Sequence, residues 1–400
     1  MSALYFYDDA RARQFEPFAL TRPVSELRAG TSLIRKRWER ATSLSSAGFI
    51  SSPHLAHFEE GTAPPAVASK VEIPAGSIVV NTRCVLPLDV KLDRFDLLMC
   101  EGMACAVRLA RALPVSQFAD GSIDLGTIQT SLGGMRLKGR WINEVWDFIG
   151  TLTEQLLEDI PHRAQSLELT TPADTTVVGK EKVFIEEGAE LGPNVVLDAS
   201  AGPILVRRGA VVSPFTHLIG PIAVGRDSQI LGDRVAISSI GDHCKVRGEF
   251  SNSIVLGHSN KGHAGFVGHS YLGRWVNLGA MTTTSNLKNT YGPIQLWTPT
   301  GVRSTGQQFL GTLFGDHAKT GIGTLLSTGT VIGAGANVFG GKMPPKVVPP
   351  FAWGEGEPYD TYEVARFLAV AERMMSRRHV ELGDKARKHL AEAHKRRWST

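Results

Sequence analysis

The chain has 400 residues, of which 42% are hydrophobic, and 42 are glycine. This length predicts two or three domains with substantial cores. The formal net charge of +4 arises at residues 359–400, where ten Lys and Arg stand against six Asp and Glu. The rest of the chain is balanced, which excludes a broad basic surface for nucleic acid.

The four cysteines have no C-x-x-C spacing and no pattern typical of a disulfide framework. They are Cys84, Cys100, Cys105 and Cys244. The first residues, M-S-A-L-Y-F-Y-D-D-A, lack the features of a signal peptide, and no stretch is long and apolar enough to span a membrane. We therefore expect a reduced, cytoplasmic protein without a membrane span.

Residues 1–165 carry no repeat, and strand patterns alternate with helix patterns. This alternation predicts an α/β, Rossmann-like layer fold. The expected strands are 3–7 and 77–80; the expected helices are 31–42 capped by Thr31, 97–113, and 141–157 followed by Pro161.

A period of six residues marks the next segment, 166–345, and fits neither an amphipathic helix nor strand alternation. The aliphatic positions are Ile185, Leu191, Leu197, then Val206, Val212, Leu218, Val224, Ile230, Ala236, and finally Leu326, Ile332, Val338. This period is typical of the hexapeptide parallel β-helix, in which each hexad supplies a short strand and a corner. Its coils bury their faces on one another. A run of glycine-rich loops, the alternative, would not keep this phase.

A proline-rich exit, K-M-P-P-K-V-V-P-P-F, leads to a basic tail, 358–398, with helical spacing of apolar residues. We expect one helix, or two broken near Gly383. The tail is expected to pack on the β-helix or on a neighbouring subunit, and contact with a membrane or polyanion is the alternative for its basic residues.

The stretch K-G-H-A-G-F-V-G-H-S-Y-L-G-R-W-V-N-L-G-A-M-T-T-T-S-N, residues 261–286, combines His263 and a second histidine with two amides and aliphatic-glycine pairs. One titratable base beside Asn277, Asn286 and a glycine-lined backbone indicates a site that handles an acyl group. From Gly262 onward the string resembles the acetyltransferase motif of the bifunctional enzymes that acetylate glucosamine-1-phosphate and uridylylate the product to UDP-N-acetylglucosamine. The glycines, the histidine and both asparagines keep the family's spacing.

The resemblance implies a left-handed β-helix that forms a homotrimer, with sites between neighbouring subunits. His263 would be the general base that deprotonates the sugar amine, and Asn277 and Asn286 would hold the acceptor. The backbone at Gly279 and Ala280 would face the thioester carbonyl of acetyl-CoA. Two further positions are carried over: Thr312 near the coenzyme A sulfur, and Lys288 as a cation for the sugar phosphate.

Three positions depart from the family pattern: Phe266 replaces a tyrosine that binds phosphate, Ser251 a lysine, and Met281 a glycine. Two other interpretations of the histidines remain. His258, His263 and His269 could be ordinary outward-facing polar residues. The His258-x₄-His263 spacing also suits zinc, but β-helix carbonic anhydrases need a third histidine, for which His217 and His243 are poorly spaced, so we expect no metal in the β-helix.

Near the start, P-F-A-L-T-R-P followed by E-L-R-A-G, residues 17–30, resembles the second half of the sugar nucleotidyltransferase signature. The glycine-rich phosphate loop is missing. Arg22 and Arg28, with Arg11 and Arg13 nearby, would bind the triphosphate of UTP or another nucleotide instead. Asp8 and Asp9, at a strand end, would hold Mg²⁺. The whole layout resembles an alternative bacterial family assigned the same two reactions.

Two hypotheses follow. The first is an acetyl-CoA-dependent N-acetyltransferase acting on an amino-sugar phosphate, fused to a degenerate nucleotidyltransferase-like domain that makes a nucleotide sugar. The second is a nucleotide-sugar-binding or nucleotidyltransferase-type protein whose β-helix is mainly a trimerisation scaffold. A base and two amides at acetyltransferase spacing favour the enzyme, because a scaffold does not need them.

Overall fold

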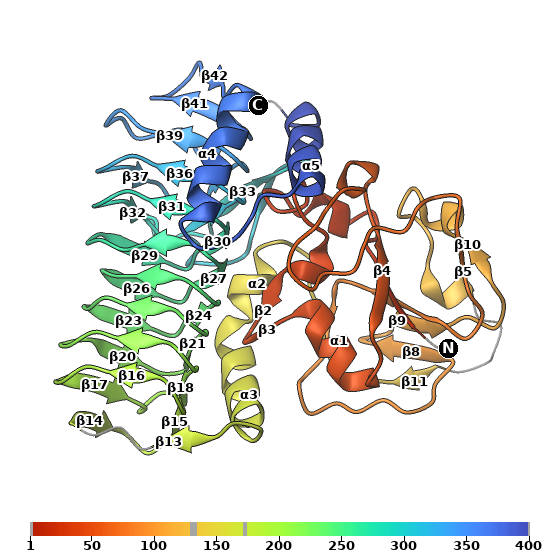
Figure 1. Ribbon diagram of the computed structural model, residues 1–400, viewed down its shortest axis with the longest axis horizontal. Coiled ribbons are helices and arrows are strands. Elements are labelled where there is room, and N and C mark those ends of the chain that lie inside the picture. Colours follow the sequence, from red (N-terminus) through yellow and green to blue (C-terminus); the bar gives the residue numbers. More distant parts are fainter. Residues whose placement is uncertain (1–2, 129–133, 171–173, 399–400) are drawn as a thin grey trace. The chain divides into compact units, whose positions relative to one another are not determined.

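A computed structural model describes residues 3–128, 134–170 and 174–398 (Figure 1). Packing divides the chain into two compact units. The N-terminal unit is Met1–Asp147 with Leu382–Arg396, and the β-helix unit is Phe148–Glu381 with Arg397–Thr400. The expected domain boundaries at residues 165 and 345 stay predictions, because this division follows packing and shares the basic tail between the units.

The N-terminal unit is built on a mixed six-stranded sheet. Strand β1 lies between β4 and β6 and is parallel to both, whereas β9 runs antiparallel to β6 and β8. In sheet order the strands are β11 (Met135–Arg136), β8 (Leu97–Cys100), β9 (Met103–Arg108), β6 (Ile78–Asn81), β1 (Leu4–Tyr7) and β4 (Ser46–Ile50). The sheet confirms the α/β class and the strands expected at 3–7 and 77–80.

The helix expected at 97–113 is wrong, because this segment forms β8, β9 and β10 (Leu113–Pro114). Gly102, with φ of +81°, turns the chain between β8 and β9. Pairing of β9 with β6 then buries Ala106 and Val107 inside the sheet. The leucine and alanine residues of this segment have a high helix propensity, but pairing with neighbouring strands of the sheet overrides such local preferences.

The other two helices of this region are shifted or split. Helix α1 is Ile34–Thr42, and its N-cap is Leu33, which makes no side-chain capping hydrogen bond. The prediction that Thr31 caps this helix is therefore wrong. A small hairpin, β2 (Arg28–Ala29) and β3 (Ser32–Leu33), occupies the expected first turn. The expected helix 141–157 appears as α2 (Asp147–Gly150) and α3 (Leu152–Ala164), and α3 continues beyond Pro161.

Short strands complete this unit and the entry to the next. Strand β12 (Arg140–Trp141) pairs with β7 (Cys84–Val85), and β5 (Glu72–Ile73) pairs with β10. Trp141 therefore lies on a strand and not in the expected helix, and its indole N–H donates to the Cys100 carbonyl at 2.7 Å. In the β-helix unit, the Phe148 ring of α2 packs edge-on against Tyr271, with centroids 5.6 Å apart.

The second unit is a β-solenoid of the left-handed β-helix type, with three parallel sheets (Figure 1). The first sheet is β15 (Val183–Glu186), β18 (Ile204–Val206), β21 (Ile222–Val224), β24 (Ser239–Ile240), β27 (Ile254–Gly257), β30 (Tyr271–Arg274), β35 (Thr312–Phe314), β38 (Thr330–Ile332) and β40 (Val347–Val348), with antiparallel β13 (Leu169–Thr170) at its start. The second is β14 (Thr175–Val178), β17 (Val195–Asp198), β20 (His217–Ile219), β23 (Arg234–Ala236), β26 (Glu249–Ser251) and β29 (Phe266–Gly268), followed by the pair β32 (Thr283–Thr284) and β37 (Leu325–Leu326).

The third sheet is β16 (Glu190–Leu191), β19 (Val211–Val212), β22 (Gln229–Ile230), β25 (Lys245–Val246), β28 (Asn260–Lys261), β31 (Asn277–Leu278), β36 (Lys319–Thr320), β39 (Asn337–Val338) and β41 (Ala352–Gly354), with antiparallel β42 (Asp360–Thr361) at its end. The hexad residues named above, with Leu191 partly and the rest fully buried, fill the interior. The hexapeptide prediction is confirmed. A hairpin, β33 (Gln295–Thr298) and β34 (Gly301–Ser304), interrupts the coil between β32 and β35.

The tail forms two helices, α4 (Val364–Ser376) and α5 (Asp384–Lys395), and Gly383 is the N-cap of α5. The expected break near Gly383 is confirmed. Helix α4 packs on the β-helix through Phe367, whose ring lies 5.7 Å from that of His317. Helix α5 packs in the N-terminal unit, where the His389 imidazole contacts the Thr21 carbonyl at 2.8 Å. Among the described residues, no helix is both long and apolar enough to cross a membrane.

Candidate functional sites

The corner between β28 and β29 carries His263, whose side chain is exposed. The backbone of this corner lies directly against the next coil: the Met281 N–H donates to the Ala264 carbonyl at 2.9 Å. Gly265 has φ of +117°, and a Cβ there would lie 2.4 Å from the Thr282 carbonyl oxygen. Close coil-to-coil contact therefore requires this glycine, and the neighbouring His263 side chain lies on the outer surface.

A second group of candidate residues lies on the sheet that contains β29. The Asn286 side-chain amide contacts His269 Nδ1 at 2.9 Å, and the His269 ring stacks on Phe309 with centroids 5.2 Å apart. Burial lowers the pKa of His269 to about 4, so the ring is neutral and its Nδ1 accepts from the amide. Gly268 leaves room for Phe266 and Asn286, since both approach the position of its missing Cβ. Asn286 is thus held by His269, which the sequence analysis named only as an ordinary polar residue.

Asn277, Thr312 and Lys288 lie elsewhere. Asn277 is on β31, in the third sheet, and accepts a hydrogen bond from Asn260 Nδ2 at 2.8 Å. Lys288 Nζ donates to the Pro293 carbonyl at 2.6 Å in the interrupting segment. The structure brings the corner of His263 against Met281 and Phe266 close to Asn286, but it distributes the full set over three successive coils and different faces of the β-helix.

Thr312 belongs to a ladder of hydroxyl groups that links successive coils. The Thr312 N–H donates to Ser270 Oγ at 3.0 Å, and the Ser270 N–H donates to Ser253 Oγ at 3.0 Å. The Thr312 side chain is completely buried, and its hydroxyl has no hydrogen-bond partner in the described chain. The coil-to-coil hydrogen bond uses the Thr312 backbone and does not account for its hydroxyl, and contact of Thr312 with coenzyme A stays a prediction.

In the backbone at Gly279 and Ala280, the Gly279 N–H donates to the Thr320 carbonyl at 3.1 Å. Within residues 3–128, 134–170 and 174–398, the Ala280 N–H makes no hydrogen bond. Of the two amides, Ala280 therefore has the donor that remains for a ligand.

The N-terminal unit offers a second candidate site at the carboxyl ends of β1 and β6. The chain passes from β1 to β4 on one side of β1 and then to β6 on the other side. In open α/β sheets, ligands bind at such a change of direction, outside the carboxyl ends of the strands. Asp8 and Asp9 follow β1, and Thr82 and Arg83 follow β6, so polar groups meet at this edge.

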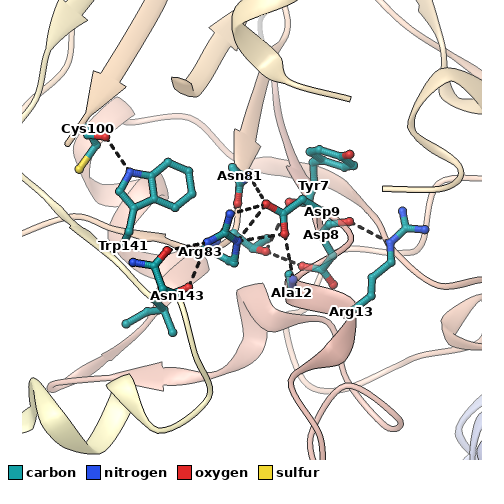
Figure 2. Close-up of polar contacts among 12 residues, drawn as sticks. Tyr7, Asp8, Asp9, Ala12, Arg13, Asn81, Arg83, Cys100, Trp141 and Asn143 are labelled. Atoms are coloured by element: carbon teal, nitrogen blue, oxygen red, sulfur yellow. Dashed lines mark hydrogen bonds and ion pairs between the residues drawn. The ribbon is translucent and has the colours of Figure 1, made fainter. Parts of the chain in front are cut away.

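Arg83 organises this edge (Figure 2). Its guanidinium donates to both Asp9 carboxylate oxygens at 2.8–3.0 Å and lies 4.8 Å from the centre of the Trp141 ring. Asn81 Nδ2 also donates to Asp9, at 2.9 Å. Burial alone would raise the pKa of Asp9, but the hydrogen bonds and charge of Arg83 outweigh it and hold this pKa below its usual value. The sequence analysis missed Arg83, which directly follows a correctly expected strand.

Asp8 is enclosed at the same edge. It accepts from Thr82 Oγ1 at 2.6 Å and from the Val24 N–H at 3.2 Å. Burial raises the pKa of Asp8 to about 6, against the opposing hydrogen bonds from Ser51, Thr82 and Val24. These two carboxylates do not fit a Mg²⁺ site as they stand, because Asp8 is buried and held by neutral donors while Arg83 occupies Asp9. Among the described residues, no group of three or more His, Cys, Asp and Glu side chains is arranged to hold a metal ion.

The arginines proposed for the nucleotide are engaged with protein groups. Arg22 is buried and forms a two-point ion pair with Glu60, at 2.9 and 3.2 Å. Arg28 donates to the Thr31 carbonyl at 2.8 Å. Arg11 pairs with Glu144, and Arg13 holds the carbonyls of Asp8, Phe118 and Ala119. Their role as a triphosphate clamp stays a prediction, and it would require these contacts to open.

Comparison with known proteins gives one family match and several relatives of low identity. Residues 4–166 match the family described as sugar nucleotidyl transferase. A bifunctional protein GlmU from Synechococcus sp. strain JA-3-3Ab is 30% identical over 203 residues, which cover 44% of this chain and 29% of the relative. GlmU of Synechococcus sp. strain CC9311 is 26% identical over 219 residues, 54% of this chain and 42% of the relative.

The chain thus spans less than half the length of each of these relatives. A solved Arabidopsis UDP-N-acetylglucosamine acyltransferase aligns with 52% of this chain and 80% of its own chain, at 12% identity, with a TM-score of 0.25, which is too low to inform the fold. The family match and the GlmU relatives agree with the resemblance found in the sequence: residues 4–166 match the sugar nucleotidyl transferase family, and the chain is similar to GlmU proteins over part of their length.

Proposed function

We propose that this protein is an acetyl-CoA-dependent N-acetyltransferase for an amino-sugar phosphate of the glucosamine-1-phosphate type, located in the cytoplasm. The observation that carries the proposal is the corner at His263. An exposed imidazole lies in this corner, the next coil contacts the corner through the Met281 N–H and the Ala264 carbonyl, and the neighbouring Ala280 N–H has no hydrogen-bond partner in the described chain. A base and an oxyanion donor on one short stretch are the two groups that acyl transfer to an amine requires.

In this mechanism the acceptor amine attacks the thioester carbonyl, and His263 removes a proton from the nitrogen as the new C–N bond forms. The Ala280 N–H stabilises the negative charge that develops on the carbonyl oxygen. Breaking the C–S bond releases coenzyme A as a thiolate, which the imidazolium can reprotonate. In this proposal Asn286, whose amide contacts His269, orients the acceptor.

We also propose a homotrimer with the acetyl-transfer sites between neighbouring β-helices. Asn277 and Asn286 lie on different faces of the coil, so one face of a single chain does not collect the proposed residues. Large exposed apolar side chains along the corner between the third and second sheets support this assembly, because water-exposed apolar patches mark contact surfaces. They are Phe215, Met281 and Ile322, with 74%, 54% and 79% of their surface exposed.

For the N-terminal unit we propose nucleotidyl transfer to the sugar phosphate from UTP or another nucleotide, giving a product such as UDP-N-acetylglucosamine. The match of residues 4–166 to the sugar nucleotidyl transferase family supports this activity. The engaged state of Asp8, Asp9 and Arg22 favours a second candidate, in which this unit binds a nucleotide sugar without turning it over.

The deciding experiment incubates the full chain with glucosamine-1-phosphate and acetyl-CoA and follows thiol release. His263→Ala should lower kcat about 10²- to 10⁴-fold, the usual effect of losing a general base. The matched control is His379→Asn, which removes another exposed imidazole; asparagine suits its positive φ of 56°. Equal rates for wild type and His263→Ala would refute the assignment of the base.

A further inference from the structure

At one interior position of the β-helix, a lysine stands where the hexapeptide rule calls for an aliphatic residue. In the third sheet, inward-facing residues stack from coil to coil, and the register pairs Val212 with Ile230, Ile230 with Val246, and Val246 with Lys261. Lys261 is only 1% exposed. An aliphatic side chain would continue this column without the cost of removing a charge from water. The lysine therefore needs a specific reason.

The ammonium group of Lys261 gathers four backbone carbonyls. Lys261 Nζ donates to His263 O at 2.6 Å, Arg247 O at 3.1 Å, and Ala264 O and Gly265 O at 3.3 Å. Three of these carbonyls are consecutive and form the corner that carries the imidazole. The fourth belongs to the same corner of the preceding coil, so one cation ties two coils together beneath His263.

The direction of these carbonyls fixes the corner. When the carbonyls of 263–265 turn inward to the cation, the His263 side chain is directed outward, as its exposure shows. Gly248, in the preceding coil, has φ of +91° and leaves room for the arrangement, because a Cβ there would lie 3.1 Å from Lys261 Nζ and 2.4 Å from Gly265 O. Hydrogen bonds from a charged donor are about twice as strong as those between neutral groups.

We propose that Lys261 is a positioning residue for acyl transfer: its buried ammonium holds the corner 262–265 from inside the β-helix and so presents the His263 imidazole to the acceptor. This inference rests on the proposed acetyl transfer at His263. Lys261 is separated from solvent by the carbonyls that it binds, so it acts through the corner and does not itself touch the substrate. Burial lowers the pKa of Lys261 to about 8, which leaves the ammonium largely charged at neutral pH.

The test compares Lys261→Met, which keeps the length and removes the charge, with Lys245→Met. Lys245 lies on β25, one coil earlier in the same sheet, at an outward position. We expect Lys261→Met to lower kcat about 10- to 100-fold, since a misplacement near 1 Å costs about 10²-fold, while KM for acetyl-CoA stays within about twofold. Lys245→Met should match the wild type in both constants.

A second readout does not depend on turnover. Hydrogen exchange of the amides at 262–265 should accelerate in Lys261→Met, and the imidazole carbon signal of His263 should shift or broaden in NMR spectra. If the wild type transfers no acetyl group, the proposed function fails, but exchange and NMR still decide whether Lys261 orders the corner.

Wild-type kcat together with an unchanged His263 signal in Lys261→Met would overturn the proposal and leave the lysine as a filler of the interior. If the methionine variant does not fold, Lys261→Gln takes its place. The same loss of kcat is then expected, and wild-type kcat in a folded glutamine variant would overturn the proposal equally.

Discussion

Gly268→Ala should separate the acceptor site from the stability of the β-helix. Gly268 ends β29, and its φ lies outside the left-handed region, so alanine suits the backbone. The new methyl group would lie 2.4 Å from Phe266 Cζ and 2.7 Å from Asn286 Nδ2. Ordinary contact begins near 3.4 Å, so the ring must retreat by about 1 Å and the amide by slightly less.

The size of the kinetic effect follows from this displacement. A misplacement of about 1 Å lowers the rate roughly 10²-fold, equivalent to about 2.7 kcal/mol in the activation free energy. We therefore expect kcat/KM for the amino-sugar phosphate to fall about 30- to 100-fold. The free energy of unfolding should change little, because both obstructing groups are the far ends of partly exposed side chains and can move. In addition, Gly→Ala lowers the conformational entropy of the unfolded chain, which stabilises the folded state by about 0.4–1 kcal/mol.

The assay is thiol release at varied acceptor concentration, with thermal unfolding measured on the same samples. Gly292→Ala is the matched control, since a Cβ there meets nothing within 4 Å and the glycine has no left-handed φ. A folded Gly268→Ala variant with kcat/KM within about twofold of wild type would show that Phe266 and Asn286 do not contact the acceptor.

Three further results are expected. Asp8→Asn should gain stability relative to wild type as pH rises from about 4 to 6. The raised pKa of Asp8, about 6, means that the wild type loses folding free energy as this carboxyl ionises, whereas asparagine does not ionise; the difference approaches roughly 3 kcal/mol by pH 7.5. A pH-independent difference in urea unfolding would contradict this. Arg83→Met should cost about 3–5 kcal/mol of unfolding free energy by leaving Asp9 buried without its cation, and Asp9→Asn in the same chain should recover part of that loss. Light scattering should give three times 43.3 kDa at micromolar concentration, and a stable monomer would remove the basis for a site between subunits.

The β-helix could be predicted from the sequence because its rule is one-dimensional. Each hexad repeats the same strand and corner, so the register of one coil predicts the next, and Val206, Val224 and Ile332 are all buried as expected. Even here the coil length varies: Ile204 pairs with Ile222, eighteen residues later, but Ser239 pairs with Ile254, only fifteen residues later. The fifteen-residue coil has shorter corners between its strands, and a strict six-residue period does not predict where these shorter corners occur.

The N-terminal unit was harder to predict because its sheet joins segments distant in the chain. Strand β9 is stabilised by pairing with β6 and β8, whereas its own amino-acid sequence favours a helix. The same reason hid Arg83, whose partners Asp9 and Trp141 lie 74 and 58 positions away in the chain. Sequence reasoning located the motif at residues 17–30, but not that Glu60 pairs with Arg22, since no local pattern connects these two residues.

Interior positions that break the hexapeptide rule are themselves informative. Lys261 and Thr320 occupy the inward column of the third sheet. The residues that precede Lys261 in this column, Val212, Ile230 and Val246, are all aliphatic. Thr320 Oγ1 contacts Thr282 Oγ1 at 2.8 Å and also accepts from the Gly279 N–H at 3.2 Å. Both exceptions therefore bind backbone of the corners at 263–265 and 279–282, where the acyl-transfer groups are proposed. Local rules are broken most often where function constrains a residue, and in a repeat fold each such break can be found by comparing one coil with the next.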